Sequence, residues 1–215
     1  MTRTINRYDA FTGLEAAIVL IAFVVVAAVF AYVVLGAGFF TTQKSQEVVH
    51  SGVKQATTNM NIAGEVYGDA TGTSNSTATG SPARIHTIIF SITLAAGGSP
   101  IDLNKTTFVF SNSTKLVTLD FASRAMTGPC SGATMPAGYQ WAICDQTNSD
   151  DDTVLEVDEK FTIWANITET LPLNPSLSGI PERDPFTLEI RPPLGASLGI
   201  SRRAPVAIDA INVLY

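Results

Sequence analysis

Few residues of this sequence have the types and spacing that catalysis requires. The chain has two histidines, His50 and His86, and no feature of the sequence brings them together. Zinc-ligand, nucleophile-elbow and phosphate-loop motifs do not occur. The run from Asp150 to Asp152 could bind a hard cation through its oxygens, although an exposed acidic loop is the simpler interpretation. The sequence therefore argues against an enzyme, and it predicts no cofactor and no metal.

The two cysteines, Cys130 and Cys144, could form a disulfide bond. They would close a loop of about 15 residues, for which the chain-entropy model gives a stabilisation of about 3 kcal/mol. Disulfides persist outside the cytosol, and a charged content of only 15% is typical of a secreted surface protein. The alternative is a pair of free, buried thiols. We favour the disulfide because an external location is indicated independently.

One carboxylate, Glu15, lies near the start of a long apolar segment that runs from Phe11 to Phe40. A carboxylate that enters an apolar bundle needs a partner to offset its desolvation. Alternatively, Glu15 stabilises the first turn of a helix, because Thr12 and Glu15 have the spacing of a capping box. The two roles can coexist.

The element that positions Glu15 is predicted to be a helix long enough to cross a membrane. No charged side chain occurs from Ala16 to Gln43, which would measure about 42 Å as a helix against a hydrocarbon core of about 30 Å. Apolar residues fall on all its faces, so lipid or other protein must surround it. Arg3 and Arg7 precede it and favour a cytoplasmic position for this end. A membrane anchor, a secretory signal cleaved near Leu35 to Gly38, and a self-assembling helix all remain open.

The helix is expected to continue to about Asn61 with an amphipathic pattern, since apolar residues recur there at spacings typical of one helix face. Small residues at four-residue spacing would allow neighbouring helices to approach closely, although alanine is common in such helices: Gly13 with Ala17, and Ala27 with Ala31.

Beyond a Gly-, Ser- and Thr-rich loop at residues 68–82, the period of the apolar residues changes from helical to two. Alternation over residues 90–94, 108–110, 117–121, 161–167 and 186–190 predicts strands with one buried face. The predicted fold class is α+β, with a long N-terminal helix and an antiparallel β-sandwich (Ig-like) or partly closed barrel. The formal net charge of −6 argues against a nucleic-acid partner.

Asn-x-Ser/Thr sequons, which are acceptors for N-glycosylation, occur at Asn75, Asn104, Asn112 and Asn166. Asn75 lies in the polar loop, Asn112 lies at a predicted hairpin tip, and Asn166 alternates with an apolar face. These three side chains are therefore expected to point outward. We expect at least two of the sequons to carry a glycan.

The stretch LEAAIVLIAFVVVAAVFAYVVLGAGFF, followed by TTQKSQEVVHSGVKQAT, resembles the N-terminus of archaeal flagellins (archaellins) and, more distantly, of type IV pilins. The resemblance implies a leader, residues 1–10, that a membrane peptidase removes by cutting between Ala10 and Phe11. Many archaellins have a basic residue and glycine before the cut, whereas this chain has Asp9 and Ala10. By analogy with pilins, Glu15 would contact the free N-terminal amine of a neighbouring subunit, although many archaellins lack this carboxylate.

The resemblance also implies the domain organisation and the function. Residues 11–61 would form an assembly helix and residues 62–215 an outer β-sandwich domain, commonly N-glycosylated. The chain would be a structural subunit of the archaellum, an extracellular helical filament for swimming, with or without other archaellins. Its expected partners are copies of itself, the leader peptidase, a membrane platform and an assembly ATPase, with the precursor in the cytoplasmic membrane. The alternatives are an adhesive type IV pilin and a monomeric membrane-anchored binding protein.

Overall fold

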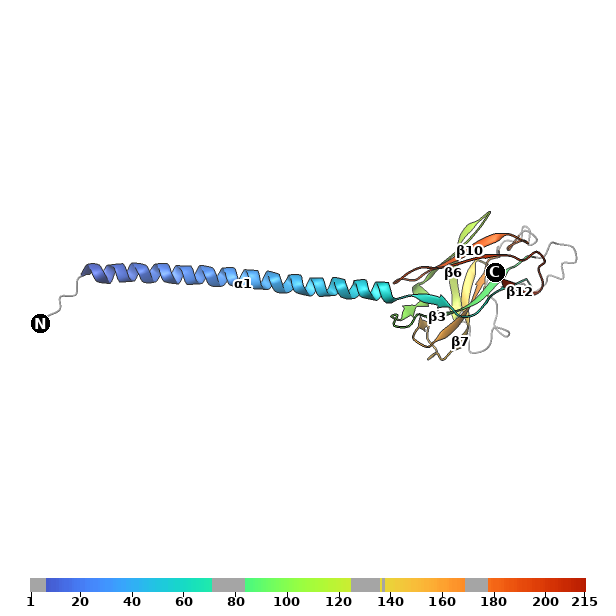
Figure 1. Ribbon diagram of the computed structural model, residues 1–215, viewed down its shortest axis with the longest axis horizontal. Helices are drawn as coiled ribbons and strands as arrows, with labels where there is room; N and C mark the ends of the chain where they lie inside the picture. The colour runs from blue at the N-terminus through green and yellow to red at the C-terminus, as the bar shows by residue number, and fades with distance from the viewer. Residues whose placement is uncertain (1–6, 71–83, 125–135, 137, 169–177) are drawn as a thin grey trace. The chain divides into compact units, whose positions relative to one another are not determined.

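The computed structural model of this protein describes residues 7–70, 84–124, 136, 138–168 and 178–215, and for residues 7–12, 123 and 124 only the backbone. Helix α1 (Arg7–Thr57) precedes a β domain that contains the short 3-10 helix η1 (Leu103–Lys105) (Figure 1). The strands are β1 (Met60–Ile62), β2 (Val66–Asp69), β3 (Thr87–Leu94), β4 (Ile101–Asp102), β5 (Thr107–Asn112), β6 (Leu116–Arg124), β7 (Gln140–Thr147), β8 (Val154–Leu155), β9 (Lys160–Asn166), β10 (Pro185–Arg191), β11 (Leu198–Arg203) and β12 (Ile211–Leu214). The chain divides into two compact units, residues 1–52 and 53–215.

Helix α1 confirms the predicted long apolar helix but ends earlier than expected. It continues without a break through Gly36 and Gly38. It stops at Thr57, short of the predicted Asn61, because Thr58 and Met60 are buried in the β domain at 1% and 2% exposure. Met60 begins β1, which pairs with β3. The apolar residue that extended the helical pattern in the sequence therefore belongs to the core of the β domain.

The main sheet of the β domain nearly closes on itself. In the described residues it has ten strands in the order β11-β10-β5-β6-β7-β9-β3-β2-β12, with β1 also paired to β3, while β4 and β8 form a separate pair. The first and last strands of this order come together where the backbone N–H of Arg203 donates to the carbonyl oxygen of Tyr215 at 3.0 Å. The predicted β-sandwich or partly closed barrel is confirmed in this barrel-like form.

The sheet is not wholly antiparallel, and the prediction was wrong on this point. Strands β6 and β7 pair in parallel, with Asp120 opposite Gln140 and Phe121 opposite Trp141. Parallel neighbours require a crossover connection rather than a tight turn. The residues between Arg124 and Gln140 supply enough chain for one, but alternation of apolar residues carries no information on strand direction.

The core lies inside the curved sheet and confirms the predicted inward faces. Phe90, Ile92 and Leu94 of β3 are buried, and so are Phe186, Leu188 and Ile190 of β10. At the centre, the ring of Trp141 stacks on Phe108 with centroids 4.1 Å apart and packs against Phe121 at 4.6 Å. Such aromatic contacts stabilise a core beyond the effect of burial alone.

Candidate assembly interface and modification sites

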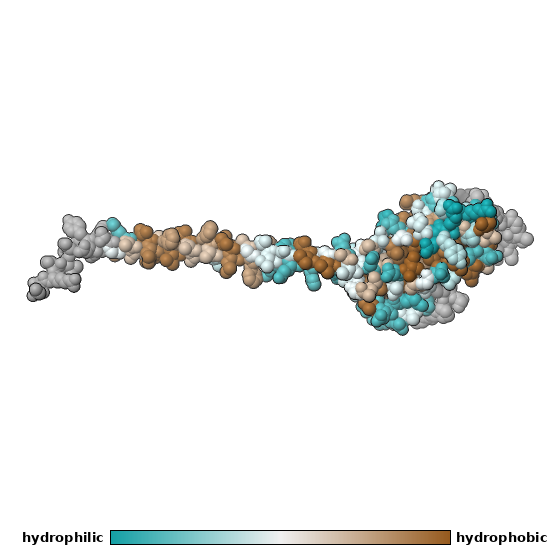
Figure 2. All heavy atoms as spheres, in the orientation of Figure 1, coloured by the Kyte–Doolittle hydropathy of each residue, from teal (hydrophilic) through white to brown (hydrophobic). Residues whose placement is uncertain are grey.

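The surface of α1 is apolar and uncovered. Large apolar side chains are exposed all along the helix, from 53% for Val34 to 80% for Tyr32. Figure 2 shows this apolar surface in brown along the helix, followed by a more polar stretch. The described part of the chain has one helix that is long and apolar enough to cross a membrane, and the most apolar stretch of this helix has no buried residue. An isolated helix with this surface needs lipid or other protein around it.

The small residues predicted for close helix packing lie on the exposed surface of α1. Gly13, Ala17, Ala27 and Ala31 are all exposed, and the members of each pair stand one turn apart on the same helix face. A Cβ atom added at Gly13 would meet no other atom within 4 Å. These positions are therefore open to another helix, and their role in assembly remains a prediction.

Glu15 is exposed on α1 and lies inside the helix rather than at its start. Because α1 begins at Arg7, neither Thr12 nor Glu15 is in the first turn, so neither has the backbone position of a helix cap that the sequence suggested. In the part of the chain that the structure describes, Glu15 has no hydrogen bond and no ion pair. Its carboxylate is available for a partner outside this chain.

The predicted cleavage point also falls within the helix. Ala10 and Phe11 both have helical backbone, and their side chains are outside the described residues. A cut between them would make Phe11 the first residue of the helix and would return Glu15 to its N-terminal end. The position of the cut remains a prediction.

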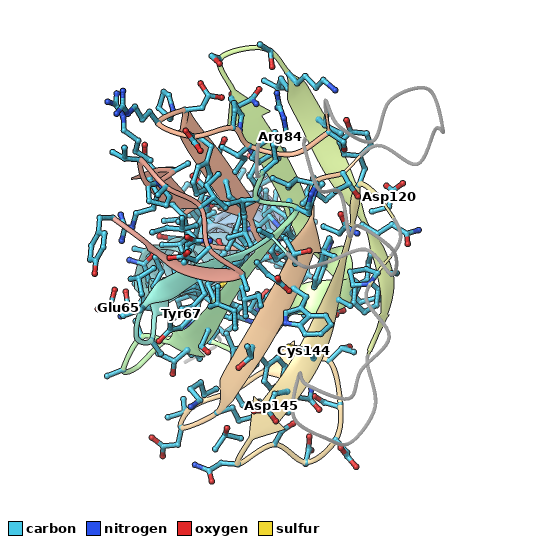
Figure 3. The ribbon with its side chains drawn as sticks, turned by 90° about the vertical axis from the view of Figure 1, so that its right-hand side faces the viewer. Glu65, Tyr67, Arg84, Asp120, Cys144 and Asp145 are labelled. Atoms are coloured by element: carbon cyan, nitrogen blue, oxygen red, sulfur yellow. The ribbon has the colours of Figure 1, made fainter. Side chains whose placement is uncertain are left out.

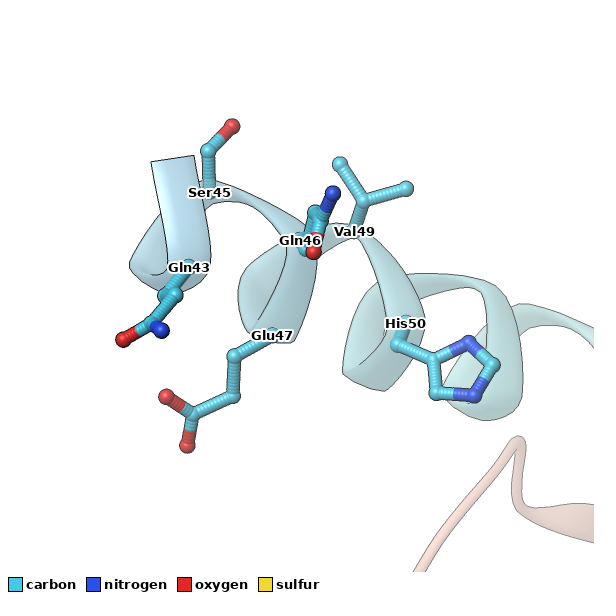
Figure 4. Close-up of a pocket in the computed structure, with 6 residues that line it drawn as sticks. All are labelled: Gln43, Ser45, Gln46, Glu47, Val49 and His50. Atoms are coloured by element: carbon cyan, nitrogen blue, oxygen red, sulfur yellow. The ribbon is translucent and has the colours of Figure 1, made fainter. Parts of the chain in front are cut away.

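The later part of α1 is polar on one side. Figure 4 shows the side chains around a shallow hollow there, with Ser45 and Val49 on one side of the helix and Gln43, Glu47 and His50 on the other. Lys44 and Glu47 form an exposed ion pair at 2.6 Å. An exposed pair of this kind contributes at most about 1 kcal/mol, so it marks a solvated face rather than a structural anchor.

Two of the sequons lie where a glycan can be attached. Asn104 is exposed in η1. Asn112 is half-buried, and its side-chain oxygen accepts from the backbone N–H groups of Thr114 and Lys115 at 3.0 and 2.7 Å. These bonds hold the turn between β5 and β6 without engaging the side-chain nitrogen, the atom to which a glycan is linked. Asn75 lies outside the described residues.

Asn166 does not point outward as expected, and this is a correction. It is 3% exposed. Its side-chain nitrogen donates to the carbonyl oxygen of Pro136 at 2.8 Å, and its oxygen accepts from the hydroxyl and backbone N–H of Thr168. Strand β9 lies between β7 and β3 in the sheet. Trp164 and Asn166 are on the face of β9 that points away from the core, and both are nevertheless buried. Alternation of apolar and polar residues predicts that a strand has two faces, but it cannot show that other residues bury both of them.

The remaining chemistry-bearing residues have structural positions. Cys144 is buried in β7 (Figure 3) and is not a free thiol, whereas Cys130 lies outside the described residues, so their pairing remains a prediction. The side chain of Asp152 accepts from the backbone N–H of Val154 at 2.7 Å, which is a turn contact. Among the described residues, no group of three or more His, Cys, Asp or Glu side chains could hold a metal ion.

His86 is a half-buried histidine whose protonation should weaken the fold. Burial lowers the pKa of its imidazole from the ordinary value of 6.5; Asp69 opposes this change and Arg84 reinforces it. Its Nδ1 is buried and has no hydrogen-bond partner among the residues that the structure describes. The unfolded chain therefore binds a proton at higher pH than the folded chain does. The contribution of neutral His86 to stability should be fully present above the ordinary pKa of 6.5 and should be lost as the pH falls below it.

Thermal unfolding of the detergent-solubilised chain from neutral to mildly acidic pH measures this effect. In a His86→Gln variant, whose side chain stays neutral, the unfolding midpoint should fall less over the same range. An equal fall in both proteins would show that other groups cause the acid sensitivity.

The chain is similar to known proteins over nearly its whole length. The family model for archaeal-type flagellin matches residues 10–202. The chain is 44% identical over 209 residues to probable flagellin 2 of Archaeoglobus fulgidus, covering 95% of this chain and 94% of that protein. It is 41% identical to probable flagellin 1 of the same organism, covering 99% and 98%. The solved archaeal flagellum of Methanospirillum hungatei matches with a TM-score of 0.63 and 32% identity, covering 94% of this chain and 99% of that one.

An uncovered apolar helix followed by a β domain defines a class of proteins that bury the helix in a membrane or against other subunits. Within that class, the matches identify one family. The chain belongs to the archaeal-type flagellin family.

Proposed function

We propose that this chain is a structural subunit of the archaellum and polymerises through α1 into a helical extracellular filament for swimming. The observation that carries the proposal is the apolar surface of α1, exposed from Leu14 to Val53. Burying each large side chain against neighbouring copies contributes roughly 1.5 to 3 kcal/mol before the costs of association. Repeated head-to-tail contacts that do not close into a ring produce a helical filament. The proposed role is structural, with no catalytic step.

The proposal includes an earlier membrane stage. The precursor would span the cytoplasmic membrane through the apolar part of α1 with its β domain outside, since Arg3 and Arg7 favour the cytoplasm. A leader peptidase would then cut between Ala10 and Phe11. Extraction of so apolar a helix from lipid requires energy from elsewhere, for which a membrane platform and an assembly ATPase are the proposed partners.

Protein sheared from the cell surface provides the test, through N-terminal sequencing and intact-mass measurement. A filament protein that begins at Phe11 would support both polymerisation and processing. A chain that begins at Met1 and is recovered only from membranes, as a monomer in detergent, would contradict the proposal and would favour a membrane-anchored binding protein.

Glycan is expected at Asn104 and Asn112 and not at Asn166. The first two side-chain nitrogens have no hydrogen-bond partner in the described structure, whereas that of Asn166 is buried in its bond to Pro136. Mass spectrometry of proteolytic peptides from filaments should find excess mass on the Asn104 and Asn112 peptides. The Asn166 peptide is the internal control, and excess mass on it would show that modification precedes folding or that β9 is accessible.

A further inference from the structure

Strand β12 places apolar residues on its outward face and a polar residue inside. Asn212 and Leu214 are buried at 7% and 1% exposure, whereas Ile211 and the following Tyr215 are exposed at 67% and 84%. Strand β10 shows the usual pattern, with Thr187 and Glu189 outward and Leu188 inward. Exposed large apolar residues that alternate along a strand require a cover that this chain does not provide in the described residues.

The inverted pattern of β12 is fixed by hydrogen bonds. The side-chain nitrogen of Asn212 donates to the carbonyl oxygens of Asp209 and Gly68 at 2.7 and 3.4 Å, and its oxygen accepts from the N–H of Asp209 at 2.9 Å. A one-residue shift would bury Ile211, but it would break these bonds and would move Leu214, now 1% exposed, to the outer face. The outward position of Ile211 is therefore a stable feature of the domain.

The apolar surface continues from β12 onto β2. Tyr67, 38% exposed, lies directly opposite Val213, so both side chains are on the same face of the sheet. We call this surface the β2–β12 strip, and its members are Tyr67, Ile211, Val213 and Tyr215. Acidic residues border it at Glu65, Asp69 and Asp209, and the basic residue Arg203 lies beside Tyr215. Asp69 pairs with Ile211 in the sheet. Figure 3 shows Glu65 and Tyr67 on one side of the β domain and Asp120 on the other.

A second exposed apolar surface lies on one side of α1. Val48, Val49 and Val53 are exposed at 63%, 60% and 55% and share one face of the helix, which we call the α1 stripe. Lys44, one turn before Val48, borders the stripe. Glu47 and His50 lie on the other side of the helix from Val49 (Figure 4). From Ala16 to Phe40 the helix is apolar all round, as the interior of a helix bundle requires. The α1 stripe lies on one side of the helix, so it needs only one covering surface.

We propose that the β2–β12 strip of one copy packs on the α1 stripe of a second copy. A helix stripe on a sheet face is a standard two-layer arrangement. The acidic border of the strip complements Lys44, whose exposed ion pair with Glu47 within the chain is weak enough to be exchanged for one across the contact. The two surfaces are different patches of the same chain, so the contact is head-to-tail and can repeat along a filament. This proposal rests on the proposed filament function and adds a specific contact to it.

Photo-crosslinking in assembled filaments tests the contact. Benzoylphenylalanine replaces Tyr215 in one variant and Leu116 in the control; Leu116 is exposed at 74% but lies on β6. Trypsin cuts after Lys44 and Lys54 and releases the peptide from Ser45 to Lys54, which carries the whole α1 stripe. The probe at Tyr215 should crosslink to this peptide, and the probe at Leu116 should not. Crosslinks from Tyr215 only to peptides of the β domain would overturn the proposal.

An independent measurement uses Ile211→Gln with Leu116→Gln as its matched control; an uncharged replacement is needed because Asp69 lies opposite Ile211 in the sheet. Both residues are exposed, so the unfolding midpoint of the solubilised chain should change little in either variant. Filament yield should fall about tenfold or more for Ile211→Gln only. Equal yields for the two variants, from a wild-type chain that does form filaments, would overturn the strip contact alone. A wild-type chain that forms no filaments would instead remove the proposed function.

Discussion

Replacement of Trp141 by alanine is expected to destabilise the β domain by about 3 to 5 kcal/mol, the range for removing a large aromatic residue from a packed core. Trp141 is fully buried, and its ring contacts both Phe108 and Phe121. These contacts join β7 to β5 and β6 across the interior of the sheet. For a domain of this size the unfolding midpoint should fall by roughly 6 to 20 °C. Circular dichroism of the detergent-solubilised chain during heating measures the change.

Leu116→Ala is the control for this prediction. Leu116 is an apolar residue of β6 that is 74% exposed, so its truncation should change stability by no more than about 0.5 kcal/mol. Similar losses in the two variants would show that burial does not determine the effect and that the packing around Trp141 has been misjudged.

Replacement of Glu15 by glutamine is expected to remove the chain from filaments while leaving its membrane insertion intact. If Glu15 contacts the N-terminal amine of a neighbour, the variant leaves that amine buried and unpaired. Loss of one member of a buried ion pair costs about 3 to 5 kcal/mol, which corresponds to well over a tenfold loss of assembly at each contact. The ratio of protein in sheared filaments to protein in membranes measures the effect.

Glu47→Gln is the matched control, because Glu47 lies on the same helix and its one ion pair in the described residues is with Lys44. Its exposed ion pair is worth about 1 kcal/mol or less, so incorporation should be nearly unchanged. Normal incorporation of the Glu15 variant would assign Glu15 to stabilising the helix end that cleavage creates. A loss of membrane protein as well as filament would indicate a defect before assembly.

The sequence predicted the parts of the fold that depend on local patterns. The absence of charge from Ala16 to Gln43 predicted α1, and the period of two predicted β3 and β10 with the correct residues inward. Both patterns are local: α1 meets an apolar environment on every face, and each face of these strands meets one environment, core or solvent, along its length. Resemblance of the first fifty or so residues also predicted the family correctly.

The sequence did not predict features that depend on distant neighbours. The parallel pairing of β6 with β7 and the burial of Asn166 both follow from which strands lie side by side. Met60 extended a helical pattern but lies in the core of the β domain. Strand β12 shows the limit most clearly, since alternation in INVLY would have directed Ile211 and Tyr215 inward. The hydrogen bonds of Asn212 and the burial of Leu214 together place them outward, where they form part of the β2–β12 strip.

The pairing of β12 with β2 also affects the order of events during synthesis. Gly68 and Asn212, which are bonded across these strands, lie 144 residues apart in the chain. The ribosome therefore completes α1 long before it delivers the strand that completes the sheet, and pairing over such a separation is slow. Throughout this interval an apolar helix and an open sheet edge would be exposed to other nascent chains. Early insertion of α1 into the membrane would protect the apolar helix from such contacts. It would also hold each chain in the membrane while its β domain folds outside.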